Sequence, residues 1–328
     1  MAAQRWRNDL RLDRIPEPAS GRRASRGFVW FVGAGPGDPE LLTLRGARLL
    51  RTADVVLHDA LVHPAILDEV TGQRIDVGKR CGRHSMRQEE ISALIVDLAL
   101  RGRRVVRLKG GDSSVLGRVG EEALVLAERD IAFEIVPGVS SATAVTSAAG
   151  IPLTHRGLAD SFVVATARRR DDGRDFSIPT YAASTTVVLM MASRTVSDWR
   201  EQLLRSGYPA ELPVALISAG CTELARVVET SVAEVEEDLE QAGLQTPILA
   251  VVGWVVTLRE RLAGGLVRLA PAERKSRGVF WGGAEHACSE GIPASTVSSG
   301  PSGMQVGTPR RPWPSIERSQ GKDGACFR

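Results

Sequence analysis

Two patterns of apolar positions alternate along the first half of the chain. Short apolar runs predict strands at residues 28–33, 54–58, 73–77, 103–108 and 133–136. Between these runs, apolar residues recur at i, i+3 and i+4, which predicts helices over 40–51, 87–100 and 119–129. Strands that alternate with helices in this order favour a parallel sheet covered by helices on both faces.

A second set of apolar runs follows in the other half. It predicts strands near 161–167, 185–190, 213–218, 224–230 and 247–252, with helices near 195–205 and 231–240. Between the two sets, the stretch "AAGIPLTHRGLADS" carries Gly, Pro and polar residues, which places a domain boundary near residue 150. We therefore expect the α/β class, with one α/β domain over 27–150 and another over 151–270.

Both ends of the chain lack this periodicity. Residues 1–26 hold seven arginines and two prolines, and we expect a disordered basic arm there; an arm that binds nucleic acid or a membrane is the alternative. Residues 271–328 should form a disordered tail, because the composition turns rich in Gly, Ser and Pro soon after residue 270.

Composition narrows the class of protein. A chain of 328 residues that is 43% hydrophobic can bury two ordinary cores, and a net charge of +3 is too small to argue for a nucleic-acid partner. The four cysteines contain no CxxC pair, so we expect no disulfide framework and a reducing, cytoplasmic compartment. Apolar runs are short, which predicts no membrane span, and the basic N-terminus lacks the apolar stretch of a signal peptide.

The loop after the first predicted strand is rich in glycine, as many nucleotide-binding loops are. Gly33-Ala34-Gly35-Pro36-Gly37 reads G-x-G-x-G, whereas the dinucleotide fingerprint is G-x-G-x-x-G followed by an acid about 20 residues on. An acid, Asp59, is present, but Pro36 removes a backbone N–H from the loop. A dinucleotide, another adenosine-type ligand and a plain structural turn all stay open on this loop alone.

Two further predicted strands run into glycine-containing loops. The strand at 103–108 is followed by "KGGDSSVLGRVGEE", and the strand at 133–136 by "PGVSSATA". Open parallel sheets bind ligands beyond the carboxyl ends of their strands. Three such loops at one edge therefore favour a ligand crevice over three unrelated turns.

Five ordered motifs between residues 32 and 161 carry a family resemblance, and with looser matches in the second half it covers about 28–260. They are "VGAGPGDPELLTLRGARLLRTADVVLHDALV", "VGKRCGRHSMRQEEI", "VVRLKGGD", "VPGVSSA" and "AGIPLTHRGLADS". Together they closely resemble the tetrapyrrole methylases. The resemblance implies two α/β domains with a ligand cleft between them, a fold distinct from the Rossmann-type methyltransferases, and a homodimer. It also implies that S-adenosylmethionine (SAM) donates methyl groups to C2 and C7 of uroporphyrinogen III, giving precorrin-2 for sirohaem or cobalamin.

The same resemblance implies roles for individual residues. Asp59 falls at the proposed proton acceptor of the family and Lys79 at its proposed proton donor, although a capping or surface role for Asp59 and a carboxylate-binding role for Lys79 remain open. The positions that match cofactor contacts are Pro36, Gly110, Gly111, Asp112, Val115, Ser140, Ser141, Met190 and Gly220. We expect no metal, because the C-x-x-H spacing of Cys81 and His84 has no second ligand pair.

The substrate implied by the resemblance carries eight carboxylates, and basic residues in the matching loops could bind them. They are Arg45, Lys79, Arg80, Arg83, His84, Arg118 and Arg156, with a solvated basic face as the alternative. The chain also departs from the family pattern, at His58, Ser113, Ser114, Leu116, Val119 and Met191. These departures leave open a methylase of a later corrin intermediate, or a cofactor-binding relative with little turnover. An oxidoreductase that binds NAD(P) is the remaining alternative.

Overall fold

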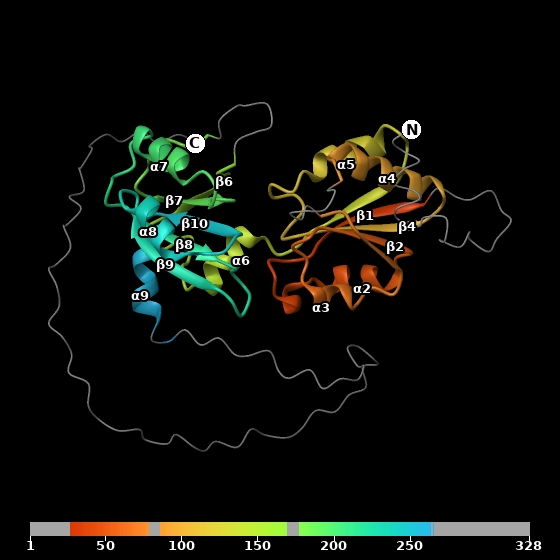
Figure 1. The fold of residues 1–328 in the computed structure, drawn as a ribbon, viewed down its shortest axis with the longest axis horizontal. Helices are drawn as coiled ribbons and strands as arrows, with labels where there is room; N and C mark the ends of the chain where they lie inside the picture. Colours follow the sequence, from red (N-terminus) through yellow and green to blue (C-terminus); the bar gives the residue numbers. More distant parts are fainter. Residues whose placement is uncertain (1–26, 79–85, 169–176, 264, 266–328) are drawn as a thin grey trace, which may run out of the picture. The chain divides into compact units, whose positions relative to one another are not determined.

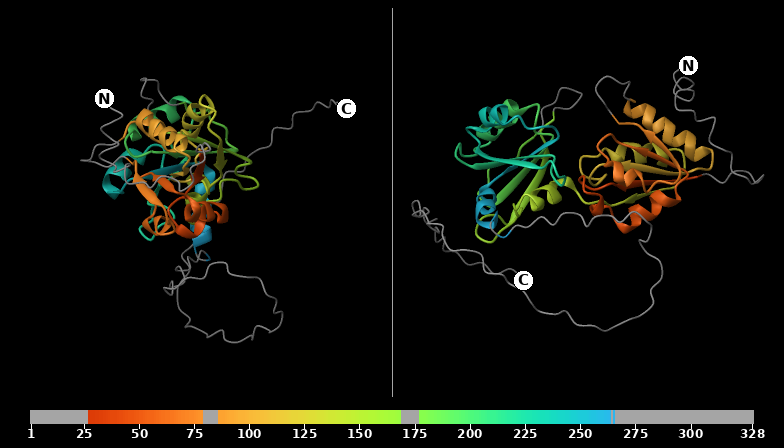
Figure 2. Two further views of the ribbon diagram at one scale, coloured as in Figure 1. Left: turned by 90° about the vertical axis from the view of Figure 1, so that its right-hand side faces the viewer. Right: turned by 60° about the horizontal axis from the view of Figure 1, so that its bottom comes forward.

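The computed structural model describes residues 27–78, 86–168, 177–263 and 265. All of them belong to one compact unit, Met1–Arg268; the rest of the chain, from Leu269 on, lies outside the described residues. Figures 1 and 2 show two sheets, each with helices packed on it. No helix within the described ranges is long and apolar enough to cross a bilayer.

The first sheet is parallel throughout and has the order β3-β2-β4-β1-β5. Its strands are β1 (Phe28–Gly33), β2 (Val55–His58), β3 (Gln73–Asp76), β4 (Arg104–Lys109) and β5 (Phe133–Val136). Helices α4 (Gln88–Leu100) and α5 (Val119–Ala127) cover one face, and α2 (Leu44–Thr52) and α3 (Pro64–Leu67) cover the other (Figure 1). The predicted parallel sheet with helices on both faces is confirmed.

Alternating side chains along the strands build the two cores of this sheet. Val29 and Phe31 of β1 pack toward α4 and α5, whereas Val32 packs toward α2 and α3. The predicted helix over 40–51 is interrupted: a short 3-10 turn, η2 (Pro39–Leu41), precedes α2. The interruption arises because Thr43 caps α2, its hydroxyl accepting a hydrogen bond from the Gly46 N–H at 3.1 Å.

The second sheet is mixed and has the order β6-β7-β10-β8-β9. Its strands are β6 (Ser161–Thr166), β7 (Thr185–Met190), β8 (Pro213–Ser218), β9 (Arg226–Ser231) and β10 (Ile248–Val252). Only β6 and β7 run parallel; β10 is antiparallel to β7 and β8, and β8 is antiparallel to β9. The apolar pattern located all five strands and left their directions open.

Helices cover both faces of the second sheet as well. One core packs β7, β8 and β10 against α7 (Val196–Arg205) and α8 (Val235–Ala242), with Trp199 fully buried in it. The opposite core packs the sheet against α6 (Ser141–Ala148), through Ala142 and Val145. The described fold ends in η3 (Trp254–Thr257) and α9 (Leu258–Ala263). The boundary near residue 150 stays a prediction, and α6, which precedes it, contributes to the second core.

Candidate functional site

Three loops after parallel strands meet backbone to backbone at the carboxyl edge of the first sheet. A Cβ added to Gly33 would lie 2.6 Å from the carbonyl oxygen of Gly111 and 2.6 Å from the Cα of Gly138. Gly35 and Gly111 also exchange two backbone hydrogen bonds, of 3.1 and 2.7 Å. Only glycines allow this approach, so the loops after β1, β4 and β5 form one cluster, as the three glycine-containing loops predict.

Asp112 ties two of these loops together. Its Oδ1 accepts a hydrogen bond from the backbone N–H of Ser114 at 2.7 Å, and its Oδ2 accepts one from Gly138 at 2.9 Å. A carboxylate held by two backbone donors fixes the spacing of the loops. A contact between Asp112 and a cofactor remains a prediction, with this structural role beside it.

The loop after β4 leaves free space on one side. Gly110 is exposed, and a Cβ added to it would meet no atom within 4 Å, in contrast to Gly33. Pro36 is half-buried between Gly35 and Gly37, which have φ values of 81° and 140°. Val115, further along the β4 loop, is also half-buried. A ligand can therefore approach the backbone at Gly110 without displacing a side chain.

The predicted pair Ser140 and Ser141 begins helix α6. The Ser140 hydroxyl accepts a hydrogen bond from the Ala142 N–H at 3.2 Å and so caps the helix. The Ser141 hydroxyl lies 3.2 Å from the position of a Cβ added to Gly111. Both serines thus lie beside the glycine cluster, although the sequence pattern did not predict the helix itself.

The two site residues predicted from the second half lie at the ends of β7 and β8. Met190 ends β7, half-buried, and the next residue, Met191, has a φ of 61°. A Cβ added to Gly220 would lie 2.3 Å from the Val145 side chain of α6, so this loop needs glycine. One added to Gly37 would lie 3.0 Å from Thr222 Cγ2, which places the proline loop near the Gly220 loop.

Asp59 follows β2 and joins a network of buried charges. Arg107 donates from Nη2 to Asp59 Oδ1 at 2.5 Å, and its Nε lies 3.4 Å from Glu122 Oε2. Lys109 Nζ donates to Glu122 Oε1 at 2.9 Å. Burial, and secondly the charge of Arg107, lowers the pKa of Lys109. The Asp59 side chain is 34% exposed, which leaves part of it open to a ligand.

Sequence reasoning missed Arg107, Lys109 and Glu122 as site residues. A signal for them exists in the pattern. Arg107 and Lys109 continue the buried face of Val105 in β4, the middle strand of the sheet, and Glu122 lies in the apolar stripe of α5 with Val119 and Ala123. Charged residues at positions that the period assigns to a core mark a built polar network.

The predicted basic residues divide into two groups. The first group lies outside the described residues: Lys79, Arg80, Arg83 and His84, together with Cys81. The role of Lys79 as proton donor therefore stays a prediction. Arg156 is exposed, Arg45 pairs with Glu134 at 2.6 Å, and Arg118 forms two hydrogen bonds with Glu121, of 2.9 and 2.8 Å. Across the residues that the structure describes, no group of three or more His, Cys, Asp or Glu side chains is arranged to hold a metal ion.

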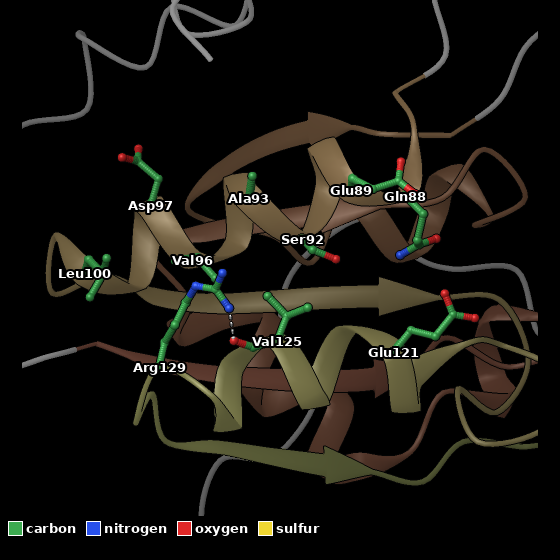
Figure 3. Close-up of a pocket in the computed structure, with 10 residues that line it drawn as sticks. All are labelled: Gln88, Glu89, Ser92, Ala93, Val96, Asp97, Leu100, Glu121, Val125 and Arg129. Atoms are coloured by element: carbon green, nitrogen blue, oxygen red, sulfur yellow. Dashed lines mark hydrogen bonds between the residues drawn. The ribbon is translucent and has the colours of Figure 1, made fainter. Parts of the chain in front are cut away.

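A separate groove of about 520 Å³ lies between α4 and α5 (Figure 3). Its lining includes Glu89, Asp97, Leu100 and Val125, and Arg129 donates to the Val125 carbonyl oxygen at 2.8 Å. None of the predicted site residues lines it. The groove therefore belongs to the helical face of the sheet rather than to the loop cluster.

Fold and loops together define a two-sheet α/β protein with a glycine cluster at the carboxyl edge of its parallel sheet, the edge at which such sheets commonly bind ligands. Comparison with known proteins supports a more specific assignment. The family of Tetrapyrrole (Corrin/Porphyrin) Methylases matches residues 29–236. The chain belongs to the tetrapyrrole methylase family, which confirms the fold and family expected from the motifs.

Individual relatives agree with this assignment. A siroheme synthase of Pseudoalteromonas atlantica is 43% identical over 264 residues, which cover 80% of this chain and 56% of the relative. The uroporphyrin-III-C-methyltransferase of Thermus thermophilus is 44% identical, with a TM-score of 0.62 over 73% of this chain and 97% of that one. A structure of Uroporphyrin-III C-methyl transferase from Thermus thermophilus complexed with S-adenyl homocysteine is 39% identical, with a TM-score of 0.63. The match covers 71% of this chain and 100% of that one. The chain thus spans about half the length of the curated relatives it matches.

Proposed function

We propose that this protein transfers methyl groups from SAM to C2 and C7 of uroporphyrinogen III and so produces precorrin-2. The proposal is supported by family membership and by the similarity to a uroporphyrin-III-C-methyltransferase over 97% of that protein. The observation that carries it is the loop cluster of Gly33, Gly111 and Gly138, beside which Gly110 leaves a free approach. The later steps that lead to sirohaem or cobalamin are not part of the proposal.

The residues of the loop cluster fit SAM. A close backbone approach at Gly110 and the half-buried Pro36 suit a flat adenosine group, and the hydroxyls of Ser140 and Ser141 are available as polar partners. Gly111, Asp112 and Val115 complete the β4 loop, while Met190 and Gly220 would provide contacts from the second half of the chain. A relative bound to S-adenyl homocysteine supports this assignment.

The reaction requires the protein to position the methyl donor against the macrocycle and to transfer protons. When bound, SAM supplies a methyl group that is already activated on a sulfonium sulfur. The loops would hold the two partners in line, which lowers the entropic cost of the encounter. After a pyrrole carbon is methylated, the macrocycle must lose a proton, and Asp59 accepts it while the C–H electron pair stays in the ring system. Lys79 is the proposed proton donor for the proton shifts that rearrange the methylated macrocycle.

Arg45, Arg118 and Arg156 would bind acetate and propionate groups of the substrate. Arg45 and Arg118 already pair with Glu134 and Glu121, but their side chains are 55% and 49% exposed. Exposed pairs of this kind contribute about 1 kcal/mol or less, so a substrate carboxylate can replace the glutamate. Charge reversal at Arg118 should raise the KM for the tetrapyrrole.

The assembly we propose is a cytoplasmic homodimer. The cysteine pattern supports a reducing compartment, and the family resemblance supports the dimer. Sedimentation of the full chain tests the dimer directly, since a monomer and a dimer of a 35.2 kDa chain separate clearly.

Transfer of label tests the function. The full chain is incubated anaerobically with uroporphyrinogen III and methyl-labelled SAM, beside a parallel sample of Asp59→Asn. We expect label in the macrocycle with the wild type and much less with the variant, by about a hundredfold or more. Binding of S-adenosylhomocysteine without any transfer would contradict the proposal and favour a later corrin substrate or a non-catalytic relative. Binding of NAD(P) in its place would favour an oxidoreductase.

A further inference from the structure

Four charged side chains form a connected network that joins the parallel sheet to helix α5. Arg107 and Lys109 come from β4, Glu122 from α5 and Asp59 from the end of β2. The side chains of Arg107, Lys109 and Glu122 are 3%, 6% and 0% exposed, whereas that of Asp59 is 34% exposed. The network therefore runs from the core to a carboxylate that a ligand can reach.

Arg107 is the link in this network. Its planar guanidinium lies between two carboxylates, with Nη2 2.5 Å from Asp59 Oδ1 and Nε 3.4 Å from Glu122 Oε2. Nη1 donates to the Leu108 carbonyl oxygen at 3.2 Å. The contact with Glu122 is an ion pair without a hydrogen bond, since Nε and Oε2 have no hydrogen-bond partner among the described residues. Because the guanidinium is planar and rigid, the attraction that turns Nε toward Glu122 also determines which nitrogen faces Asp59.

Glu122 balances the buried charge. Arg107 and Lys109 are both cations, and Glu122 contacts both; Gln88 donates a further hydrogen bond to its Oε1 at 2.7 Å. A buried cation that loses its partner is strongly destabilised, because neither water nor a counter-charge compensates it. Replacing Glu122 would thus remove one of the two carboxylates that hold Arg107 and would loosen its present orientation.

We propose that Glu122 is a positioning residue, which acts through Arg107 to hold the Asp59 carboxylate in place for proton transfer. The inference rests on the proposed function, in which Asp59 accepts a proton from the methylated macrocycle. Arg107 engages Oδ1, so Oδ2 is the oxygen that forms the new O–H bond as the substrate C–H bond breaks. Glu122 and Arg107 exchange no proton in this step.

A double-mutant cycle between Glu122 and Asp59 tests the inference. The variants are Glu122→Gln, which keeps the shape and removes the charge, Asp59→Asn, and the combination of both. Glu128→Gln is the matched control, since Glu128 follows the same helix and its side chain is 70% exposed. Should Glu122→Gln fail to fold, Arg107→Lys takes its place in the cycle, because a lysine cannot contact two carboxylates as a fork.

Two readouts are taken from each variant. The first is kcat with the SAM KM: we expect Glu122→Gln to lower kcat by about tenfold or more, to change the SAM KM by less than about twofold, and to have no further effect on kcat once Asp59 is Asn. The second is the melting temperature, where the two changes should be non-additive by roughly 2–4 °C. The control Glu128→Gln should change neither readout.

The readouts separate the inference from the proposed function. Additive changes in both kcat and melting temperature would overturn the inference, because Glu122 would then stabilise the fold without acting on Asp59. Non-additive melting temperatures in a protein without methyl transfer would support the link from Glu122 to Asp59 and overturn the proposed function. Non-additive results in both readouts would support both.

Discussion

Ser113 is a buried residue whose hydroxyl has no hydrogen-bond partner among the residues that the structure describes. An unpaired buried polar group costs free energy, because it loses water and gains nothing. Ser113→Ala should raise the free energy of unfolding by about 1 kcal/mol, measured by urea denaturation. Ser114, the exposed neighbour, gives the control, since Ser114→Ala should leave the free energy of unfolding unchanged. A lower free energy of unfolding for Ser113→Ala would show that the Ser113 hydroxyl has a partner.

Met191 has a left-handed backbone, with a φ of 61°. A side chain at such a position costs about 1–2 kcal/mol that glycine avoids. Met191→Gly should therefore unfold at higher denaturant than Met191→Ala, which is the reverse of the order expected in a helix. Ala47→Gly inside α2, compared with the unchanged chain, supplies that reverse order as a control. Equal stability of the two Met191 variants would contradict the strain.

The burial of Lys109 makes the free energy of unfolding depend on pH. Its pKa is lowered by burial first and by Arg107 second, so between the folded pKa and the ordinary value of 10.5 the unfolded chain binds more protons. The free energy of unfolding should therefore gain from this group as pH rises through that window. Lys109→Met removes the gain, and denaturation from neutral pH to pH 10.5 should show a flatter curve for the variant. Parallel curves would contradict the lowered pKa.

At the scale of elements, the glycine cluster distinguishes packing from ligand contact. Gly33→Ala would place a Cβ 2.6 Å from backbone atoms of two other loops and should destabilise the fold by about 3 kcal/mol. Gly110→Ala meets no atom within 4 Å and should leave stability unchanged, while it lowers the affinity for S-adenosylhomocysteine. Thermal melting and calorimetry check the two effects. A Gly110 variant with unaltered affinity would remove Gly110 from the cofactor site.

The elements also show which helices and strands the apolar pattern predicts and which it does not. It located each strand to within one or two residues. The clearest signals come from strands buried on both faces, such as β2 and β10, which give uninterrupted apolar runs. It did not predict that β10 runs antiparallel between β7 and β8, since strand direction is decided by tertiary connections. Helix α6 was missed because its eight residues, SATAVTSA, are rich in Ser, Thr and Ala and carry little apolar contrast.

The candidate site was predictable in part for related reasons. Gly33, Gly110, Gly111 and the serine pair lie at or just beyond the ends of apolar strands, so the pattern identifies them. Arg107 and Glu122 do not, because each lies inside an element where the pattern predicts a core residue and its partner is distant in the sequence. A charge at a core position predicts that a partner exists, but only the fold identifies the partner.

At the scale of the molecule, each of the two sheets supplies different residues of the proposed site. The parallel sheet supplies the loop cluster and Asp59, and the mixed sheet supplies Met190 and Gly220. A ligand that binds the folded chain stabilises it by mass action. A concentration of S-adenosylhomocysteine near 100 times its Kd should add about 2.7 kcal/mol to the free energy of unfolding, and NAD should add nothing.

The number of methyl groups per macrocycle tests the central claim most directly. The full chain is supplied anaerobically with uroporphyrinogen III and an excess of SAM, and the product mass is measured. Our account predicts a product that carries two added methyl groups, and about a hundredfold less of it or lower still when Asp59 is replaced by Asn. Unchanged uroporphyrinogen III, from a protein that still binds S-adenosylhomocysteine, would contradict it.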